Sequence, residues 1–165
     1  DDRDHLLGPN DVGEIVVRGR HVMMGYWKNP ELTDRTIRNG WYHSGDMGYL
    51  DEEGYLFLVD RKADMIVTGG FNVFPREVED VLATHDAVGQ VVVIGVPDEK
   101  WGEVGRAYVL AQPGHEIPPP SDISDYCRGH LAPYKVPKQF VTVQDFPRTA
   151  AGKIQKHLLP PPDLP

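Results

Sequence analysis

The sequence predicts an α+β fold whose first part, residues 1–60, is rich in β-strands and whose second part, residues 61–165, mixes strands with helices. The β-branched run at 14–18 is bounded by glycines, which is typical of a short strand with a turn at each end. The segment 51–54 ends in a glycine and separates two apolar runs, as in a β-hairpin whose glycine takes a positive φ. After the polar segment 60–64, strand-like runs alternate with helical periodicity, so we place the boundary there.

Two helices are predicted in the second part. Pro75 suits the first turn of a helix, because its fixed φ and missing N–H cost nothing there, and acidic residues follow near the electropositive end. Ser121 or Asp122 is expected to cap another helix. The apolar face of that helix would consist of Ile123, Tyr126, Cys127 and Leu131.

Three further strands complete the second part. The near-continuous apolar run at 87–96 predicts a buried strand. Shorter strands are expected at 107–111 and 140–143, and a proline-rich tail from Pro160 is expected to be extended or frayed.

Composition excludes several classes of function. The net charge of −8 disfavours broad binding to nucleic acid or to anionic lipid. The single cysteine excludes an internal disulfide framework and a multi-thiolate zinc site, and we predict no metal ligands in this chain. No apolar run is long enough to cross a bilayer and the chain opens without a signal-peptide pattern, so we expect a cytoplasmic protein. The start at Asp1 suggests a piece of a longer protein.

Three segments contain residue types suited to nucleotide chemistry. Asp46 follows a tight glycine turn and offers two acceptors, which suits a pair of ribose hydroxyls, although a turn aspartate bonding its own backbone is the simpler explanation. The segment 60–77 combines basic residues with glycines that let a ligand approach the backbone, or it is a linker, a strand and a helix start. Lys153 follows a small, flexible run and can neutralise charge on phosphate oxygens, or it is a solvated lysine.

The joint occurrence of these segments in this order resembles the C-terminal part of the adenylate-forming (AMP-binding) superfamily, which includes acyl- and aryl-CoA synthetases. The matching motifs are Tyr42-His43-Ser44-Gly45-Asp46, the segment 60–79 and the segment 147–156, preceded by a family-like stretch at 13–33. The resemblance implies that residues 1–60 are the tail of the large nucleotide-binding domain. It also implies that residues 61–165 are a small mobile domain with a hinge at 60–64.

The resemblance also implies roles for individual residues. Lys153 would be the catalytic lysine, and Asp46 and Arg61 would bind the ribose and phosphate region of ATP, AMP and the acyl-adenylate. Gly69 and Gly70 would border the channel for the pantetheine of CoA. Three further residues would contact CoA: Trp101 beside the pantetheine, for which a core aromatic is an equal alternative, and Tyr134 and Lys138 at the CoA nucleotide.

The implied activity is that of an ATP-dependent acid–CoA ligase: adenylation of a fatty or aromatic carboxylic acid, then thioester formation with CoA. The family's phosphate loop and acyl pocket do not occur in this sequence, so we expect the fragment alone to be inactive and its Mg site to lie in a missing N-terminal large domain. The unpaired remainder of that domain would expose apolar surface, so self-association is plausible. The family's hinge residue corresponds to Ala63, and the basic residue common in the CoA segment of aryl-CoA ligases corresponds to Val136.

Three alternatives to the ligase stay open. A peptide-synthetase adenylation domain and a luciferase-type enzyme share the lysine and ribose motifs. A non-catalytic interaction module is the third, and the intact Asp46, Arg61 and Lys153 argue against it. A hydrolase is excluded, because His43, Ser44 and Asp46 are too close in sequence to form a triad and no nucleophile elbow is present.

Overall fold

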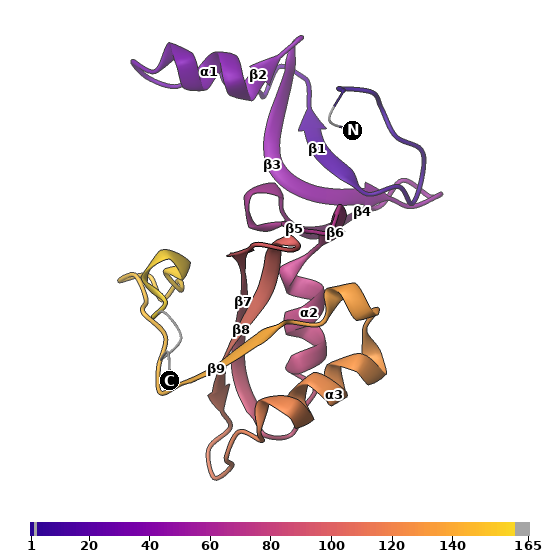
Figure 1. The fold of residues 1–165 in the computed structure, drawn as a ribbon. Helices are drawn as coiled ribbons and strands as arrows, with labels where there is room; N and C mark the ends of the chain where they lie inside the picture. Colours follow the sequence, from indigo (N-terminus) through magenta and orange to yellow (C-terminus); the bar gives the residue numbers. More distant parts are fainter. Residues whose placement is uncertain (2, 161–165) are drawn as a thin grey trace. The chain divides into compact units, whose positions relative to one another are not determined.

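The computed structural model describes residue 1 and residues 3–160, and it consists of two compact units (Figure 1). The N-terminal unit comprises residues 1–63 and the C-terminal unit begins at residue 64. Each unit contains its own sheet and the described residues include three α-helices, which confirms the α+β class. Apart from Pro160, the tail that the sequence predicts to be extended or frayed lies outside the described residues.

The N-terminal unit is built on one long central strand. β3 (Trp41–Leu50) pairs with β1 (Gly13–Val17), β2 (Ile37–Arg38) and β4 (Leu56–Arg61), and all three pairings are antiparallel. The predicted hairpin is present: Leu50 pairs with Leu56 across the turn, and Gly54 has a φ of 84°. The glycine is therefore needed at the position where the sequence places it.

A helix that the sequence reasoning missed, α1 (Pro30–Thr36), precedes β2. Its signal was available. The side chain of Asn29 accepts a hydrogen bond of 3.0 Å from the Leu32 N–H, and Pro30 and Glu31 occupy the first turn. This is a capped start of the kind that favours a helix even over a short span.

The C-terminal unit contains a five-stranded sheet with the order β6-β5-β8-β7. Its strands are β5 (Ile66–Thr68), β6 (Phe71–Val73), β7 (Val88–Asp98), β8 (Gly102–Ala111) and β9 (Gln139–Val143). β9 pairs parallel with β8 at residues 106–110, whereas β5 pairs with the other end of β8 at Gly102. The three predicted strands are confirmed, and β8 begins five residues before the predicted 107 because Gly102 closes a tight turn at a φ of 78°.

Helices α2 (Pro75–Leu82) and α3 (Pro120–His130) pack on one face of this sheet. Pro75 occupies the first turn of α2, as predicted. The predicted cap of α3 is wrong: the cap position is Pro119, and Ser121 and Asp122 lie inside the first turn. Pro119 and Pro120, the last two of three consecutive prolines, fix the backbone for helix entry, and the Ser121 hydroxyl donates to the Asp122 carboxylate at 2.8 Å.

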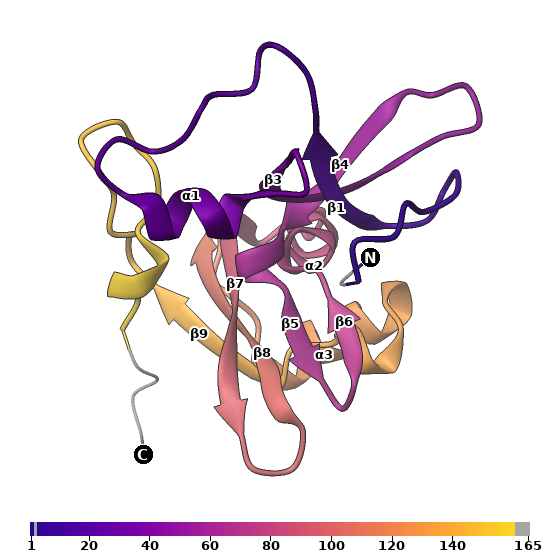
Figure 2. The same cartoon turned by 90° about the horizontal axis from the view of Figure 1, so that it is seen from above.

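The two faces of the sheet are covered by different parts of the chain, because side chains alternate along a strand. Val93 and Val109 point into the core that α2 and α3 complete. Their neighbours Val92 and Tyr108 pack against Ile154 in the segment after β9. Figures 1 and 2 show that segment (yellow) and α3 on opposite sides of β7 and β8. The turn that contains Lys153 therefore lies on the face away from the helices.

Three single 3₁₀ turns complete the described chain. They are η1 (Lys62–Asp64), η2 (Pro133–Lys135) and η3 (Lys156–Leu158). η1 follows Arg61, η2 contains Tyr134, and η3 begins three residues after Lys153, so these turns matter for the candidate site.

Candidate functional site

Asp46 and Arg61 lie directly opposite each other on β3 and β4. Arg61 Nε contacts Asp46 Oδ1 at 2.8 Å, and both side chains are open to solvent. A carboxylate and a guanidinium side by side offer acceptors for two hydroxyls and a fork of donors for a phosphate. Two residues 15 positions apart, both predicted as nucleotide ligands, are thus brought together by the register of one hairpin.

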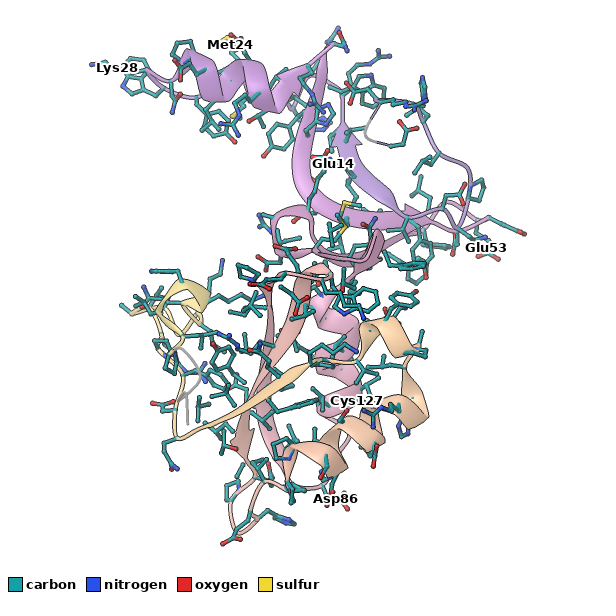
Figure 3. The ribbon with its side chains drawn as sticks, in the orientation of Figure 1. Glu14, Met24, Lys28, Glu53, Asp86 and Cys127 are labelled. Atoms are coloured by element: carbon teal, nitrogen blue, oxygen red, sulfur yellow. The ribbon has the colours of Figure 1, made fainter. Side chains whose placement is uncertain are left out.

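Glu14 on β1 fixes the turn that presents Asp46, and Figure 3 labels it beside β3. Its carboxylate accepts hydrogen bonds from the Gly45 N–H at 3.2 Å and from Lys62 Nζ at 3.0 Å, and lies 3.3 Å from His43 Nδ1. Burial acts to raise the pKa of Glu14, but the hydrogen bonds and charges of Lys62 and His43 outweigh it and hold the pKa below its ordinary value. Glu14 was not singled out by the sequence, since its partners come from β3 and η1.

Tyr42, the first residue of the same motif, also lies near this site. A hydrogen bond with Tyr26 raises the pKa of the Tyr42 hydroxyl, and the charge of Asp46 raises it further. The stretch containing Tyr26 and the motif containing Asp46 therefore meet around one hydroxyl pair. The Tyr42 hydroxyl therefore stays neutral at physiological pH and can donate as well as accept hydrogen bonds.

Gly69 and Gly70 form the two-residue turn of the β5–β6 hairpin. Their φ values are 56° and 85°, which is the pattern of a type I′ turn. A Cβ on Gly69 would lie 2.8 Å from the Trp101 ring, whereas a Cβ on Gly70 would meet nothing within 4 Å. Gly69 is therefore required by close packing and Gly70 faces open space.

Trp101 lies at the surface rather than in the core. It is 44% exposed, its ring covers Gly69, and its carbonyl accepts a hydrogen bond of 2.9 Å from the Gly69 N–H. Asp98 fixes the preceding turn by accepting from the Trp101 N–H at 2.9 Å. Of the two interpretations that the sequence left open for Trp101, the core aromatic is wrong.

A second exposed aromatic group flanks the same hairpin. Phe71, which follows Gly70, stacks on Tyr134 with ring centroids 4.7 Å apart. Lys135 holds η2 in place through two bonds of 2.6 and 2.7 Å to Glu77 on α2. Lys138 is exposed and directly precedes β9. The hairpin thus joins Gly69, Gly70, Trp101 and Tyr134 into one surface; Phe71 was missed because one exposed aromatic in a strand carries no sequence signal.

Val136 and Pro137 lie between Tyr134 and Lys138, and both are buried. Val136 belongs to the core that α2 and α3 complete. The departure from the basic residue of aryl-CoA ligases is therefore an apolar contact inside this unit, and no charge replaces it at that position.

Lys153 sits on a tight turn held by its own backbone. The Thr149 N–H donates to the Lys153 carbonyl at 2.8 Å, the Lys153 N–H donates to Thr149 Oγ1 at 3.2 Å, and Gly152 supplies a φ of 82°. The side chain is exposed and forms no hydrogen bond or ion pair with any other described residue. Its ammonium is thus available for a ligand. No hydrogen bond among residues 3–160 joins this turn to the Gly69–Gly70 hairpin.

Other reactive groups do not form sites in the described part of the chain. Residues 1 and 3–160 contain no cluster of three or more histidine, cysteine or acidic residues able to hold a metal ion. Cys127, labelled on α3 in Figure 3, is buried, and burial raises the pKa of its thiol to about 11, so it is inert at neutral pH. None of the described helices has the length and apolarity that crossing a bilayer requires.

We compared the chain with known protein families and with curated proteins. Residues 77–153 match the family model described as the AMP-binding enzyme C-terminal domain. The chain is 46% identical over 154 residues to a long-chain-fatty-acid–CoA ligase of Bacillus subtilis (strain 168), covering 93% of this chain and 27% of the relative. It is 44% identical over 151 residues to a 2-succinylbenzoate–CoA ligase of Geobacillus sp. (strain WCH70), covering 92% of this chain and 30% of the relative. The chain thus spans less than a third of the length of these curated relatives.

Solved structures agree with the sequences. The o-succinylbenzoate CoA synthetase of Bacillus subtilis, in complex with its acyl-adenylate intermediate, matches 92% of this chain and 31% of its own at a TM-score of 0.82 and 39% identity. The amide bond synthetase of Marinactinospora thermotolerans matches 95% of this chain and 32% of its own at a TM-score of 0.85 and 39% identity. The chain is therefore similar to the C-terminal parts of adenylate-forming, AMP-binding enzymes, and residues 77–153 match the C-terminal domain of that family. Within that class its curated relatives are acid–CoA ligases, which confirms the resemblance inferred from the motifs.

Proposed function

We propose that this chain is the C-terminal part of an ATP-dependent acid–CoA ligase, which first adenylates a carboxylic acid and then transfers the acyl group to the CoA thiol. The observation that carries the proposal is the state of Lys153. Its side chain is exposed and has no hydrogen-bond or ion-pair partner among residues 1 and 3–160, and backbone hydrogen bonds fix its turn. An exposed ammonium of this kind can neutralise charge on a reacting phosphate.

In the first step, Lys153 bridges the substrate carboxylate and the α-phosphate of ATP. Asp46 accepts hydrogen bonds from the ribose hydroxyls. Arg61 gives up part of its contact with the Asp46 carboxylate and donates to the phosphate region instead. The contact of 2.8 Å between these two side chains supports this division, because each holds the other in place until the nucleotide arrives. A bound Mg would supply charge neutralisation at the phosphates, and we expect its ligands in a large domain outside this chain.

In the second step, the Gly69–Gly70 hairpin borders the path of the pantetheine thiol. Trp101 walls one side of it, and Tyr134 and Lys138 bind the nucleotide end of CoA. The surface that joins Gly69, Trp101, Phe71 and Tyr134 supports this assignment. Since Lys153 and this hairpin are separate features of one unit, the unit must turn at residues 60–64 between the steps.

A different acceptor is the second candidate for the second step. The match to an amide bond synthetase favours it, because an acyl-adenylate can react with an amine as well as with a thiol. We further propose that the ligase acts in the cytoplasm on a fatty or aromatic acid, and that the isolated chain self-associates.

The test uses the full-length enzyme and the Lys153→Ala variant. We expect ATP–pyrophosphate exchange to fall about 100- to 1,000-fold, the usual effect of removing one preorganised charge-stabilising group, while thiolysis of a preformed acyl-adenylate stays within a few-fold of wild type. Arg20→Ala, which removes an exposed charge elsewhere, is the control. The 165-residue chain alone should show no exchange.

Two results contradict the proposal. Unchanged exchange in Lys153→Ala removes the catalytic role of Lys153, and exchange by the isolated chain removes the need for a large domain. A screen of CoA, cysteamine and simple amines as acceptors then separates a CoA ligase from an amide-forming enzyme.

A further inference from the structure

The turn that contains Lys153 is fixed to the C-terminal unit on both sides. On the N-terminal side, Arg148 donates to Gln90 on β7 at 2.5 Å and to the Gly152 carbonyl at 3.2 Å. Directly after Lys153, Ile154 packs on the core beneath it with Val92 and Tyr108. The turn is therefore attached to the sheet, although the Lys153 side chain itself is exposed.

The attachment on the C-terminal side involves Lys156. Its Nζ contacts Asp64 Oδ2 at 2.8 Å, and the two side chains are only 34% and 37% exposed. These residues are 92 positions apart, so the ion pair is a tertiary contact rather than a local one. Asp64 is the residue with which the C-terminal unit begins.

Ala63, the residue before Asp64, lies between two ion-paired residues. Ala63 has no polar side chain, and on its other side Lys62 bonds to Glu14 within the N-terminal unit. Each neighbour of Ala63 is thus tied by an ion pair to its own unit. Asp64 follows Ala63 directly, so its ion pair connects the residue after Ala63 to Lys156, which lies three residues from Lys153.

We infer that Asp64 and Lys156 are a pair of positioning residues that connect the Lys153 turn to the first residue of the C-terminal unit. The inference rests on the proposed function, since it concerns the reach of Lys153 during adenylation. Neither residue touches the reacting atoms. The pair acts by holding the turn, because a displacement of about 1 Å at a reacting group can cost about 100-fold in rate.

The test compares Asp64→Asn and Lys156→Met with the full-length wild-type enzyme in both half-reactions. We expect kcat for adenylation to fall about 10-fold with little change in the KM for ATP, and thiolysis of a preformed acyl-adenylate to stay unchanged. The charge exchange Asp64→Lys with Lys156→Asp should restore part of the loss. Asp125→Asn, which breaks the exposed pair with Arg128 on α3, is the matched control and should have no effect.

A second measurement does not depend on activity. Amide hydrogen exchange at residues 149–153 of the 165-residue chain should be faster in Asp64→Asn than in wild type, and unchanged in Asp125→Asn. Two results would overturn the inference. One is an unchanged rate of amide hydrogen exchange at residues 149–153 in Asp64→Asn. The other is an equal loss of rate in both half-reactions that the charge-swapped double variant does not recover. A wild-type enzyme without adenylation activity would refute the proposed function instead, and the hydrogen-exchange result would still test the contact.

Discussion

Gly69 and Gly70 both take a positive φ, yet a methyl group would meet different surroundings at the two positions. Either alanine variant should lose about 1 kcal/mol of unfolding free energy, because an L-residue is strained in this conformation. Gly69→Ala should in addition displace the Trp101 ring, which lies 2.8 Å from the new Cβ. We therefore expect a shift in tryptophan emission for Gly69→Ala and none for Gly70→Ala.

The background variant Trp101→Phe is the control for this experiment, since the emission shift should disappear in it. Equal spectra for the two alanine variants would contradict the close contact between Gly69 and Trp101. The comparison also bears on the channel, because only Gly70 faces the open space that a thiol would need.

The site could be predicted in part from single residues. The motifs identified Asp46, Arg61, Gly69 and Lys153 as candidates, and the structure pairs the first two across a hairpin. Glu14 and Phe71 lie within family-like segments, but the motifs gave neither of them a role, since the importance of each lies in partners that are distant in sequence. Trp101 was ambiguous for a related reason: the exposure of a tryptophan is decided by its neighbours in space, and here the nearest is a glycine.

At the scale of elements, β1, β3 and η1 are joined by the Glu14 carboxylate. Its pKa lies below the ordinary value, so the native state releases this proton more readily than the unfolded chain does. The stabilisation is therefore complete above about pH 4.3, the ordinary pKa of a glutamate, and is lost as the pH falls through the lower native pKa.

Urea unfolding at pH 5.5 and at pH 3 should reveal this dependence. At pH 5.5 we expect Glu14→Gln to unfold about 1–3 kcal/mol more easily than wild type, because it leaves charged partners unsatisfied. At pH 3 the difference should shrink. A constant difference between the two pH values would show that the carboxylate charge does not contribute. Glu52→Gln, in the exposed turn after β3, is the control.

The elements themselves were predicted where local chemistry decides them. The turn at Gly54 and the start of α2 at Pro75 follow from backbone preferences that each residue carries with it. The cap of α3 was assigned wrongly, because Ser121 has the right side chain but Pro119 and Pro120 before it set the helix entry. The ion pair between Asp64 and Lys156 could not be predicted from the sequence, since a contact between residues 92 positions apart depends on the order of the strands in the sheet.

At the scale of the whole molecule, the N-terminal unit exposes apolar side chains on its β3–β4 hairpin. Leu56 and Leu58 lie on the same face of β4 and are 51% and 65% exposed, and Leu50 pairs with Leu56. The same unit contains a concavity of ≈ 800 Å³, which is lined in part by residues of this hairpin and of β1. Exposed apolar side chains of this kind favour association.

Sedimentation velocity over a range of concentrations should show reversible self-association of the 165-residue chain. The double variant Leu56→Lys/Leu58→Lys should reduce it, whereas Leu158→Lys, at an exposed leucine of the C-terminal unit, should not. A monomer at all concentrations would refute the prediction. In a full-length enzyme the double variant should instead lower solubility or yield, because the large domain would cover this face.

The parallel pairing of β9 with β8 has a consequence for how the protein is made. Until residues 139–143 emerge from the ribosome, the N–H and C=O groups of β8 at 106–110 have no partner on that edge. The intervening α3 must also be synthesised before this parallel strand can dock, so closure is a late event during translation. Chains that stall before residue 139 would carry an open strand edge, and these are the ones most exposed to aggregation and most in need of a chaperone.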